Sequence, residues 1–170
     1  MLAPVAALTR FRPDTSVLGN RARDQAAYTR HSVKVGDTGI FLPYLERVEI
    51  VELQSVCPIP NTPMWFMGMI NNRGNLMPVF DLKLFMAMGV DQPSRWLMIL
   101  GHGSKAAGLC IDSLPAVIEN PQLVDVDQAV VQTAVPQALL RHLAGTYMHN
   151  GKVWVDLDYD KLFPDLCARF

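Results

Sequence analysis

Several groups of residues in this sequence could support chemistry if their spacing fitted a known kind of site. Asp156, Asp158 and Asp160 stand at alternate positions, as the first carboxylates of a calcium-binding loop do. That loop then requires glycine where Lys161 stands and glutamate where Cys167 stands. The calcium interpretation therefore fails. The alternation with apolar residues favours an exposed strand face that leads into a terminal helix.

The glycines and histidines are not spaced for catalysis either. Gly101, Gly103 and Gly108 would need a further glycine at Ala106 to form a dinucleotide-binding loop. The histidines form neither an H-E-x-x-H pair nor part of a G-x-S-x-G elbow, and we expect all of them at the surface: His31, His102, His142 and His149. The sequence therefore predicts a protein that is not an enzyme and has no cofactor and no metal site.

The cysteines do not indicate a disulfide framework or a zinc site. Cys57, Cys110 and Cys167 are an odd set without a C-x-x-C pair, so we expect buried free thiols. No apolar run reaches the roughly 20 residues that a membrane helix needs. No positive side chain precedes the short apolar stretch at residues 1–8, which argues against a secretory signal. We therefore expect a cytoplasmic protein without membrane insertion.

Composition and charge leave open both a protein that binds other proteins and one that binds nucleic acid. The chain has 170 residues, of which 50% are hydrophobic and 18% charged, as in one compact globular unit. Residues 1–34 carry six Lys and Arg against two Asp, so the remainder is mildly acidic. A small β-barrel that binds nucleic acid through aromatics is the alternative from a different class, but only 8% of the residues are aromatic. The basic arm is more typical of simple solvation.

Most elements that would position functional residues are short strands. Alternating apolar residues predict strands from about Thr29, with one hairpin at residues 36–39 and another across residues 101–104. Prolines predict an extended loop over residues 58–63. Short helices are expected over residues 81–89 and 137–143, and another over residues 20–28 within an N-terminal arm.

The chain also contains an internal repeat. A shift of 77 residues lays Gly68, Gly74 and Asp81 on Gly145, Gly151 and Asp158, and a shift of 69 lays residues 39–48 on residues 108–117. Each half carries about five short strand signals, and a small sheet is stable only if it closes or packs on a partner. Two small barrels packed together are therefore the expected architecture.

The first copy of the repeat contains the most informative motif. Residues 68–82 read G-M-I-N-N-R-G-N-L-M-P-V-F-D-L, which predicts a strand, a tight turn, a second strand and the start of a helix. Gly74 suits a backbone with positive φ, Pro78 marks an edge or a bulge, and Asp81 can cap the helix.

This stretch resembles the signature of the CheW family, G-x-x-N-L-R-G-x-x-x-P-x-x-D-L, with Asn72 in place of the usual leucine. The resemblance runs from about Thr29 to Phe163. It implies an all-β fold with a few short helices, made of two intertwined five-stranded β-barrel subdomains. We expect an N-terminal arm at residues 1–28, a CheW-like domain at residues 29–164 with subdomains at about 29–90 and 91–164, and a C-terminal tail at residues 165–170.

The resemblance also implies a function. Members of the family are non-enzymatic adaptors that couple a chemoreceptor to a CheA-type histidine kinase in chemotaxis or in pilus (twitching) signal transduction. The implied partners are the regulatory domain of the kinase and the cytoplasmic tip of the receptor. The N-terminal arm, Trp65 and the departure at Asn72 look more like the pilus-associated PilI-type branch than like the flagellar one.

The resemblance also implies partner-binding residues, which are assigned by their positions in the family's motifs. Arg73 matches the functionally sensitive arginine of N-L-R-G, and Glu49 matches the glutamate of a V-x-E-I segment near the receptor groove, in which Arg47 replaces the usual valine. Neighbouring Asn71 and Asn72 complete this set of partner-binding candidates.

The residues themselves leave alternatives open for these candidates. Arg73 suits direct partner contact and an internal salt bridge equally, and Glu49 also suits a solvated strand position. Trp65 is the expected exposed anchor, while Phe66 and Met67 suit the core. The second copy of the repeat has Asn150 where the first has Arg73, which makes the arginine the better candidate for function.

Overall fold

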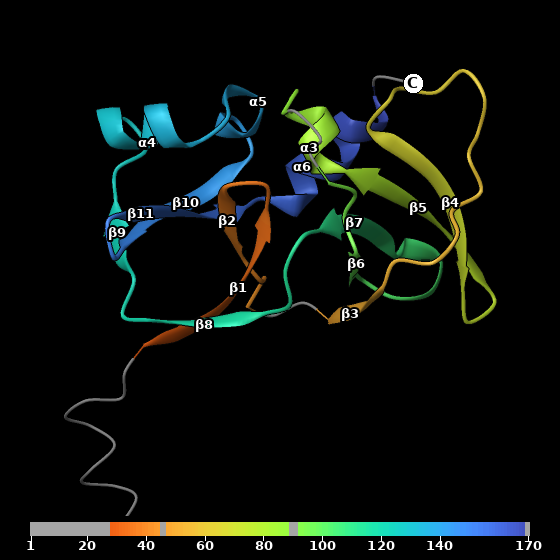
Figure 1. Cartoon of the computed structure of the whole chain (residues 1–170), viewed down its shortest axis with the longest axis horizontal. Helices are drawn as coiled ribbons and strands as arrows, with labels where there is room; N and C mark the ends of the chain where they lie inside the picture. The colour runs from red at the N-terminus through yellow and green to blue at the C-terminus, as the bar shows by residue number, and fades with distance from the viewer. Residues whose placement is uncertain (1–27, 45–46, 89–91, 169–170) are drawn as a thin grey trace, which may run out of the picture.

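A computed structural model describes residues 28–44, 47–88 and 92–168. The basic arm expected at residues 1–28, with its helix over residues 20–28, lies outside the described residues except for Tyr28. Two curled sheets lie side by side, and the short helices α4 Ala129–Ala134 and α5 Gln137–Leu140 run along one edge of the molecule (Figure 1). The predicted all-β class with a few short helices is confirmed.

Sheet A and sheet B together account for all the strands that the structure describes. Sheet A has the strand order β8-β1-β2-β11-β10-β9, with β1 Thr29–Val35, β2 Thr38–Phe41, β8 Ala116–Glu119, β9 Gln122–Val124, β10 Leu143–His149 and β11 Lys152–Leu157. Sheet B has the order β3-β6-β7-β5-β4, with β3 Val48–Glu52, β4 Phe66–Asn72, β5 Asn75–Asp81, β6 Trp96–Leu100 and β7 Ala107–Ile111.

In each sheet the two edge strands are consecutive along the chain, so the sheet closes on itself. In sheet A only Asn120 and Pro121 separate the edge strands β8 and β9, which together act as one bent strand. In sheet B the edge strands β3 and β4 are joined by residues 53–65, where Cys57 makes an isolated antiparallel bridge to Met69 of β4. Counted in this way, each barrel has five strands, as predicted.

The two barrels exchange strands, which is why they are intertwined. The hairpin β1–β2 belongs to the first half of the sequence but lies in sheet A, and the hairpin β6–β7 from the second half lies in sheet B. Each exchanged hairpin joins its host sheet through a parallel pair, β2 with β11 and β5 with β7. The predicted subdomain boundary at residue 90 stays a prediction about the two halves of the sequence. It does not separate the two sheets, because each sheet takes strands from both sides of residue 90.

The two glycines that match in the upstream repeat stand at these parallel junctions. Gly39 pairs with Trp154 and Gly108 pairs with Val79. A Cβ atom on Gly39 would lie 2.1 Å from the Trp154 ring, and one on Gly108 would lie 2.9 Å from Leu97. The repeated glycine therefore marks a place where the strand backbone and a neighbouring side chain approach closely.

The two hairpins of the downstream repeat have the same geometry. Arg73 and Gly74 form the turn between β4 and β5, and Asn150 and Gly151 form the turn between β10 and β11, all four with positive φ. Both hairpins carry a register shift seven residues before the turn. Each leads into a helix capped by an aspartate, α3 Leu82–Phe85 after Asp81 and α6 Tyr159–Cys167 after Asp158. The predicted repeat is thus a structural one.

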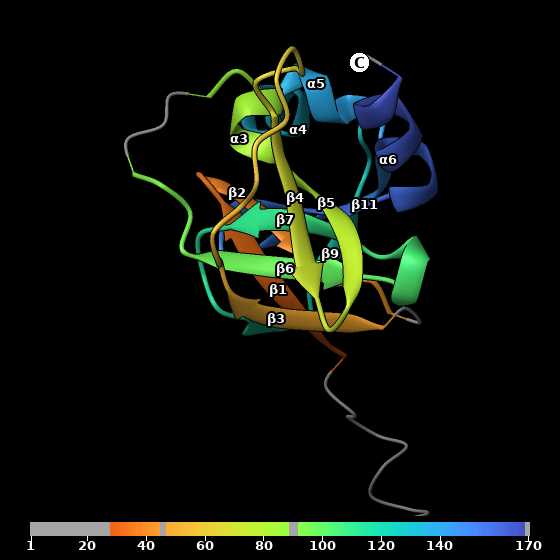
Figure 2. The same cartoon turned by 90° about the vertical axis from the view of Figure 1, so that its right-hand side faces the viewer.

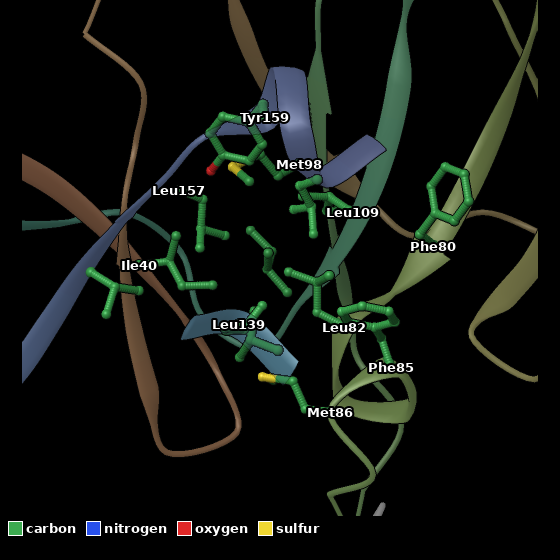
Figure 3. Close-up of a cluster of buried hydrophobic side chains, with 14 of the residues drawn as sticks. Ile40, Phe80, Leu82, Phe85, Met86, Met98, Leu109, Leu139, Leu157 and Tyr159 are labelled. Atoms are coloured by element: carbon green, nitrogen blue, oxygen red, sulfur yellow. The ribbon is translucent and has the colours of Figure 1, made fainter. Parts of the chain in front are cut away.

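One hydrophobic core lies between the sheets. Ile40 and Leu157 of sheet A face Met98 and Leu109 of sheet B across it, with Leu139 covering one end (Figure 3). Leu139 belongs to α5 Gln137–Leu140, which follows α4 Ala129–Ala134. Each barrel also has a smaller buried cluster of its own, around Val79 and Leu97 in sheet B and around Phe41 and Trp154 in sheet A, so the shared core joins two barrels that are already partly filled.

The helices differ in length from the prediction. Helix α3 ends at Phe85, because Ala87 takes a positive φ of 54° that ends the helix before Gly89, which lies outside the described residues. Helix α5 ends at Leu140, since the chain enters β10 at Leu143. The tail predicted at residues 165–170 begins too early, because α6 continues to Cys167 with Leu166 fully buried.

Several predictions of exposure are wrong because side chains find partners across the fold. His142 is buried, with Nε2 3.0 Å from Oδ2 of Asp165. Asp156 is half-buried and forms a two-pronged ion pair with the buried Arg30, so the face of β11 is not an exposed one. Conversely, of the free cysteines expected to be buried, Cys57 and Cys167 are exposed; only Cys110 is inside.

A polar cluster around Asp112 ties the two barrels together. The side chain of Lys83, only 6% exposed, donates from Nζ to Oδ1 of Asp112 over 2.8 Å. The amide of Gly36, in the β1–β2 turn, donates to Oδ2 over 2.7 Å, and the Ser94 hydroxyl donates to Oδ1. Partial burial alone would raise the pKa of Asp112, but these hydrogen bonds and the charge of Lys83 outweigh it and lower the pKa below its ordinary value.

We predict that Asp112→Asn lowers the free energy of unfolding by about 2 kcal/mol at pH 7, because it leaves the buried Lys83 without its counter-ion. A carboxyl with a lowered pKa stabilises the fold above the ordinary value of about 4, and this stabilisation is lost as the pH falls through the lower, folded-state pKa. Urea denaturation between pH 7 and pH 3 should therefore show the unfolding free energies of the wild type and Asp112→Asn approaching each other as the pH falls. Glu119→Gln, an exposed control on β8, should match the wild type throughout. A gap between Asp112→Asn and the wild type that does not change with pH would contradict the account.

A second prediction concerns the seam of sheet B, the line along which β4 meets β3 and the joining residues 53–65. Gly68 has a φ of 127°, and a Cβ atom there would lie 2.1 Å from the carbonyl oxygen of Cys57, whereas Gly74 has a φ of 85° and open space around it. Gly68→Ala should cost at least about 3 kcal/mol of unfolding free energy, and Gly74→Ala about 1 kcal/mol from backbone strain alone. If thermal denaturation showed the same loss of stability for Gly68→Ala and Gly74→Ala, the seam would not be closely packed.

Candidate partner-binding site

A hollow of about 180 Å³ lies at one end of sheet B, where three chain segments meet. These segments are the β4–β5 turn, the β6–β7 turn with its 3-10 helix η1 Gly103–Lys105, and the start of β3. Figure 2 shows the β4–β5 turn reaching to the level of β3. The lining residues are Arg47, Glu49, Asn72, Arg73, Asn75, Met77, Ile99, Gly101, His102, Gly103 and Ala106.

An ion pair between Arg73 and Glu49 crosses this hollow. Nη2 of Arg73 lies 2.5 Å from Oε1 of Glu49, which stands opposite Ile99 in the β3–β6 ladder. The pair joins the β4–β5 turn to the other edge strand of the same sheet, so it spans the seam of sheet B. The internal salt bridge considered for Arg73 is therefore present.

The pair nevertheless remains open to a partner. The Arg73 side chain is 67% exposed and that of Glu49 is 29% exposed. A guanidinium group has five N–H donors, and this contact engages one of its nitrogens. Arg73 can therefore hold Glu49 and present further donors at the surface, which means that the salt bridge and partner contact are compatible roles.

The structure brings some of the predicted site residues together and separates others. Asn72 lines the hollow beside Arg73. Asn71 is exposed, and its Oδ1 accepts a hydrogen bond from the Gly74 amide over 2.8 Å, which fixes the turn that carries the arginine. Trp65 lies at the opposite end of β4, so it cannot share a contact with Arg73.

Trp65 is also less exposed than expected. It is half-buried, its ring meets that of Phe85 edge-on with 5.7 Å between the centroids, and its Nε1 donates to the Leu166 carbonyl over 3.4 Å. These contacts attach β4 to α3 and α6. A partner-binding role for Trp65 stays a prediction.

Sequence reasoning did not find the other polar residues of the hollow. Arg47 was noted only as a departure from the family pattern, and Asn75 and His102 carried no signal, because only the closure of sheet B brings their segments together. Apolar Met77 and Ile99 are buried beneath the polar rim.

A second, larger hollow lies between the barrels. It measures about 430 Å³ and is lined by Thr29, Arg30, His31, Leu42, Pro43, Tyr44 and Val48. Val48 belongs to sheet B and immediately precedes Glu49, whereas most of the other walls come from β1 and the segment after β2. Tyr44 is 86% exposed beside it. This hollow provides a partly apolar surface that both barrels share.

Two further observations concern other kinds of site. Among the residues that the structure describes, no group of three His, Cys, Asp or Glu side chains is placed to hold a metal ion. No helix in the described part of the chain is both long and apolar enough to cross a membrane.

Comparison with known proteins places these features in a family. The family profile described as CheW-like domain matches residues 31–167. The chain is 31% identical over 120 residues to protein FrzA of Myxococcus xanthus, a match that covers 69% of this chain and 72% of the relative. It is 30% identical over 95 residues to chemotaxis protein CheW of Helicobacter pylori, where the match covers 55% of this chain and 57% of the relative.

A solved structure shares the fold. The scaffolding protein TtCheW from Thermoanaerobacter tengcongensis superimposes with a TM-score of 0.61 at 20% sequence identity, over 79% of this chain and 86% of that chain. At this identity the likeness concerns the fold.

We predict that Arg73→Gln changes the free energy of unfolding by less than about 1 kcal/mol, because exposed ion pairs contribute little to stability. Glu49→Gln should behave in the same way. Urea denaturation at low and high salt measures both effects. A loss of more than about 2 kcal/mol for either variant would mean that the pair holds the barrel closed and is chiefly structural.

Proposed function

The chain belongs to the CheW-like domain family, and we propose that it is a non-enzymatic adaptor that couples a chemoreceptor to a CheA-type histidine kinase. The adaptor works by surface complementarity, and its partners lie in the cytoplasm. The chain matches a little over half the length of the Helicobacter relative. Similarity to protein FrzA and to chemotaxis protein CheW supports a role in two-component signalling.

The single observation that carries the proposal is the asymmetry between the two copies of the repeat. Both hairpins keep the turn glycine, the register shift and the capping aspartate, which build the fold. Only the first copy places an arginine in its turn, where Arg73 meets Glu49 at an exposed hollow, while Asn150 occupies the equivalent position. The second copy forms the same turn with Asn150, so the fold does not require arginine at this position. Arg73 in the first copy is therefore free to serve partner binding.

The two hollows suit the two kinds of partner. The larger hollow between the barrels, with Val48 on one wall and the exposed Tyr44 beside it, offers apolar surface for the receptor tip. The smaller, polar hollow at the end of sheet B suits a turn of the barrel-like regulatory domain of the kinase. Glu49 lies next to Val48, so the two contacts adjoin.

The nucleic-acid alternative has less support in the structure. Base stacking needs exposed aromatics along a basic face. Among the described residues, the large hydrophobic side chains that are strongly exposed include only two aromatics, Tyr28 and Tyr44. The hollow itself presents a carboxylate, Glu49, which repels a phosphate backbone.

A binding assay tests the proposal. The immobilised regulatory domain of the CheA-type kinase from the same organism should retain the purified chain, and Arg73→Gln should weaken this binding by about tenfold while the protein stays folded. Arg95→Gln is a matched control, because Arg95 forms another exposed ion pair at sheet B. Its Nε lies 3.4 Å from Oε1 of Glu52. It should bind as the wild type does.

Absence of binding by the folded wild-type chain would contradict the adaptor role. Where the organism has both flagellar and pilus kinases, the two regulatory domains should be compared side by side. Preference for the pilus kinase would support the PilI-type branch indicated by the sequence.

A further inference from the structure

The hollow at the end of sheet B carries more positive charge than its ion pair uses. Arg47 and Arg73 line it together with His102, and Glu49 is the only carboxylate among the described residues of the lining. Glu49 is engaged by Arg73. Arg47 is exposed and has no ion-pair partner among the described residues. The lining therefore has a formal charge of +1 on a chain whose net charge is −1.

We propose that this hollow accepts an Asp or Glu side chain of the kinase regulatory domain, and that Arg47 is the residue that selects it. This inference rests on the adaptor function proposed above and specifies the chemistry of one of its contacts. A carboxylate matches the planar, two-pronged donor geometry of a guanidinium group, so one acidic side chain can satisfy Arg47. The spare donors of Arg73 lie in the same lining.

The shape of the hollow fits a single side chain. Its volume of about 180 Å³ is too small for a helix or a strand. On the β6–β7 side the lining includes Gly103, where a Cβ atom would meet no other group within 4 Å, so this side of the hollow is open. Buried Met77 and Ile99 underlie the polar rim, and an apolar floor strengthens the attraction between charges held above it.

The local charges favour a carboxylate over a nucleic-acid backbone. Binding of successive phosphates requires a stripe of cations. Here Arg47 is followed on β3 by two carboxylates, Glu49 and Glu52, and by no further cation. A single acidic side chain in the hollow meets Glu49, whose charge Arg73 already pairs, whereas an extended polyanion along β3 would also meet Glu52.

Charge reversal tests the proposal. Binding of the kinase regulatory domain should weaken about tenfold in Arg47→Glu and a few-fold in Arg47→Gln, mainly through faster dissociation. The wild-type interaction should also be more sensitive to salt than that of Arg47→Gln. Lys105→Glu is the matched control, because Lys105 is an exposed cation of the same β6–β7 turn that does not line the hollow. It should bind within about twofold of the wild type.

A reciprocal reversal identifies the occupant. Each Asp and Glu on the surface of the regulatory domain is replaced singly by Lys, and at least one replacement should restore the binding of Arg47→Glu while weakening that of the wild type. The proposal is overturned if Arg47→Glu binds as the wild type does, or if no replacement restores it. It is also overturned if Arg47→Glu loses only the binding of a single-stranded oligonucleotide. Failure of the wild type to bind the kinase domain at all would instead overturn the adaptor function itself.

Discussion

Unpaired backbone groups at the edges of a small β-sheet are the constraint on which the rest of this molecule depends. A short sheet with open edges exposes N–H and C=O groups that invite pairing with other chains. Both sheets meet the constraint by joining their edge strands, directly through Asn120 and Pro121 in sheet A and through residues 53–65 in sheet B. Exchange of the hairpins β1–β2 and β6–β7 then makes each barrel depend on the other, and the shared core and the Asp112 cluster hold both in one unit.

The site follows from the difference between the two closures. Sheet A closes within two residues, Asn120 and Pro121. Sheet B closes over a longer segment, and the β4–β5 turn reaches back to β3, which places Arg73 against Glu49 above a small hollow. The same hairpin thus completes a barrel in both copies of the repeat, and in the first copy it also places charged groups at the surface.

Local signals in the sequence were sufficient for much of the fold. The repeat, the turn at Gly74 and the cap at Asp81 were predicted because each rests on backbone preferences that neighbouring residues reveal. The buried ion pair of Arg30 with Asp156 and the burial of His142 could not be predicted, since their partners come from distant segments. At the site, Arg73 and Glu49 were identified by resemblance. Their contact, and the presence of His102 beside them, depend on how sheet B closes.

Reconstitution of signalling tests the coupling role most directly. The CheA-type kinase and membranes that carry its receptor are mixed with and without the purified chain, and kinase autophosphorylation is measured as the receptor ligand is varied. A coupling adaptor predicts that the kinase follows receptor occupancy only when the chain is present. A response of the same size without the chain, or no response with it, would contradict this account.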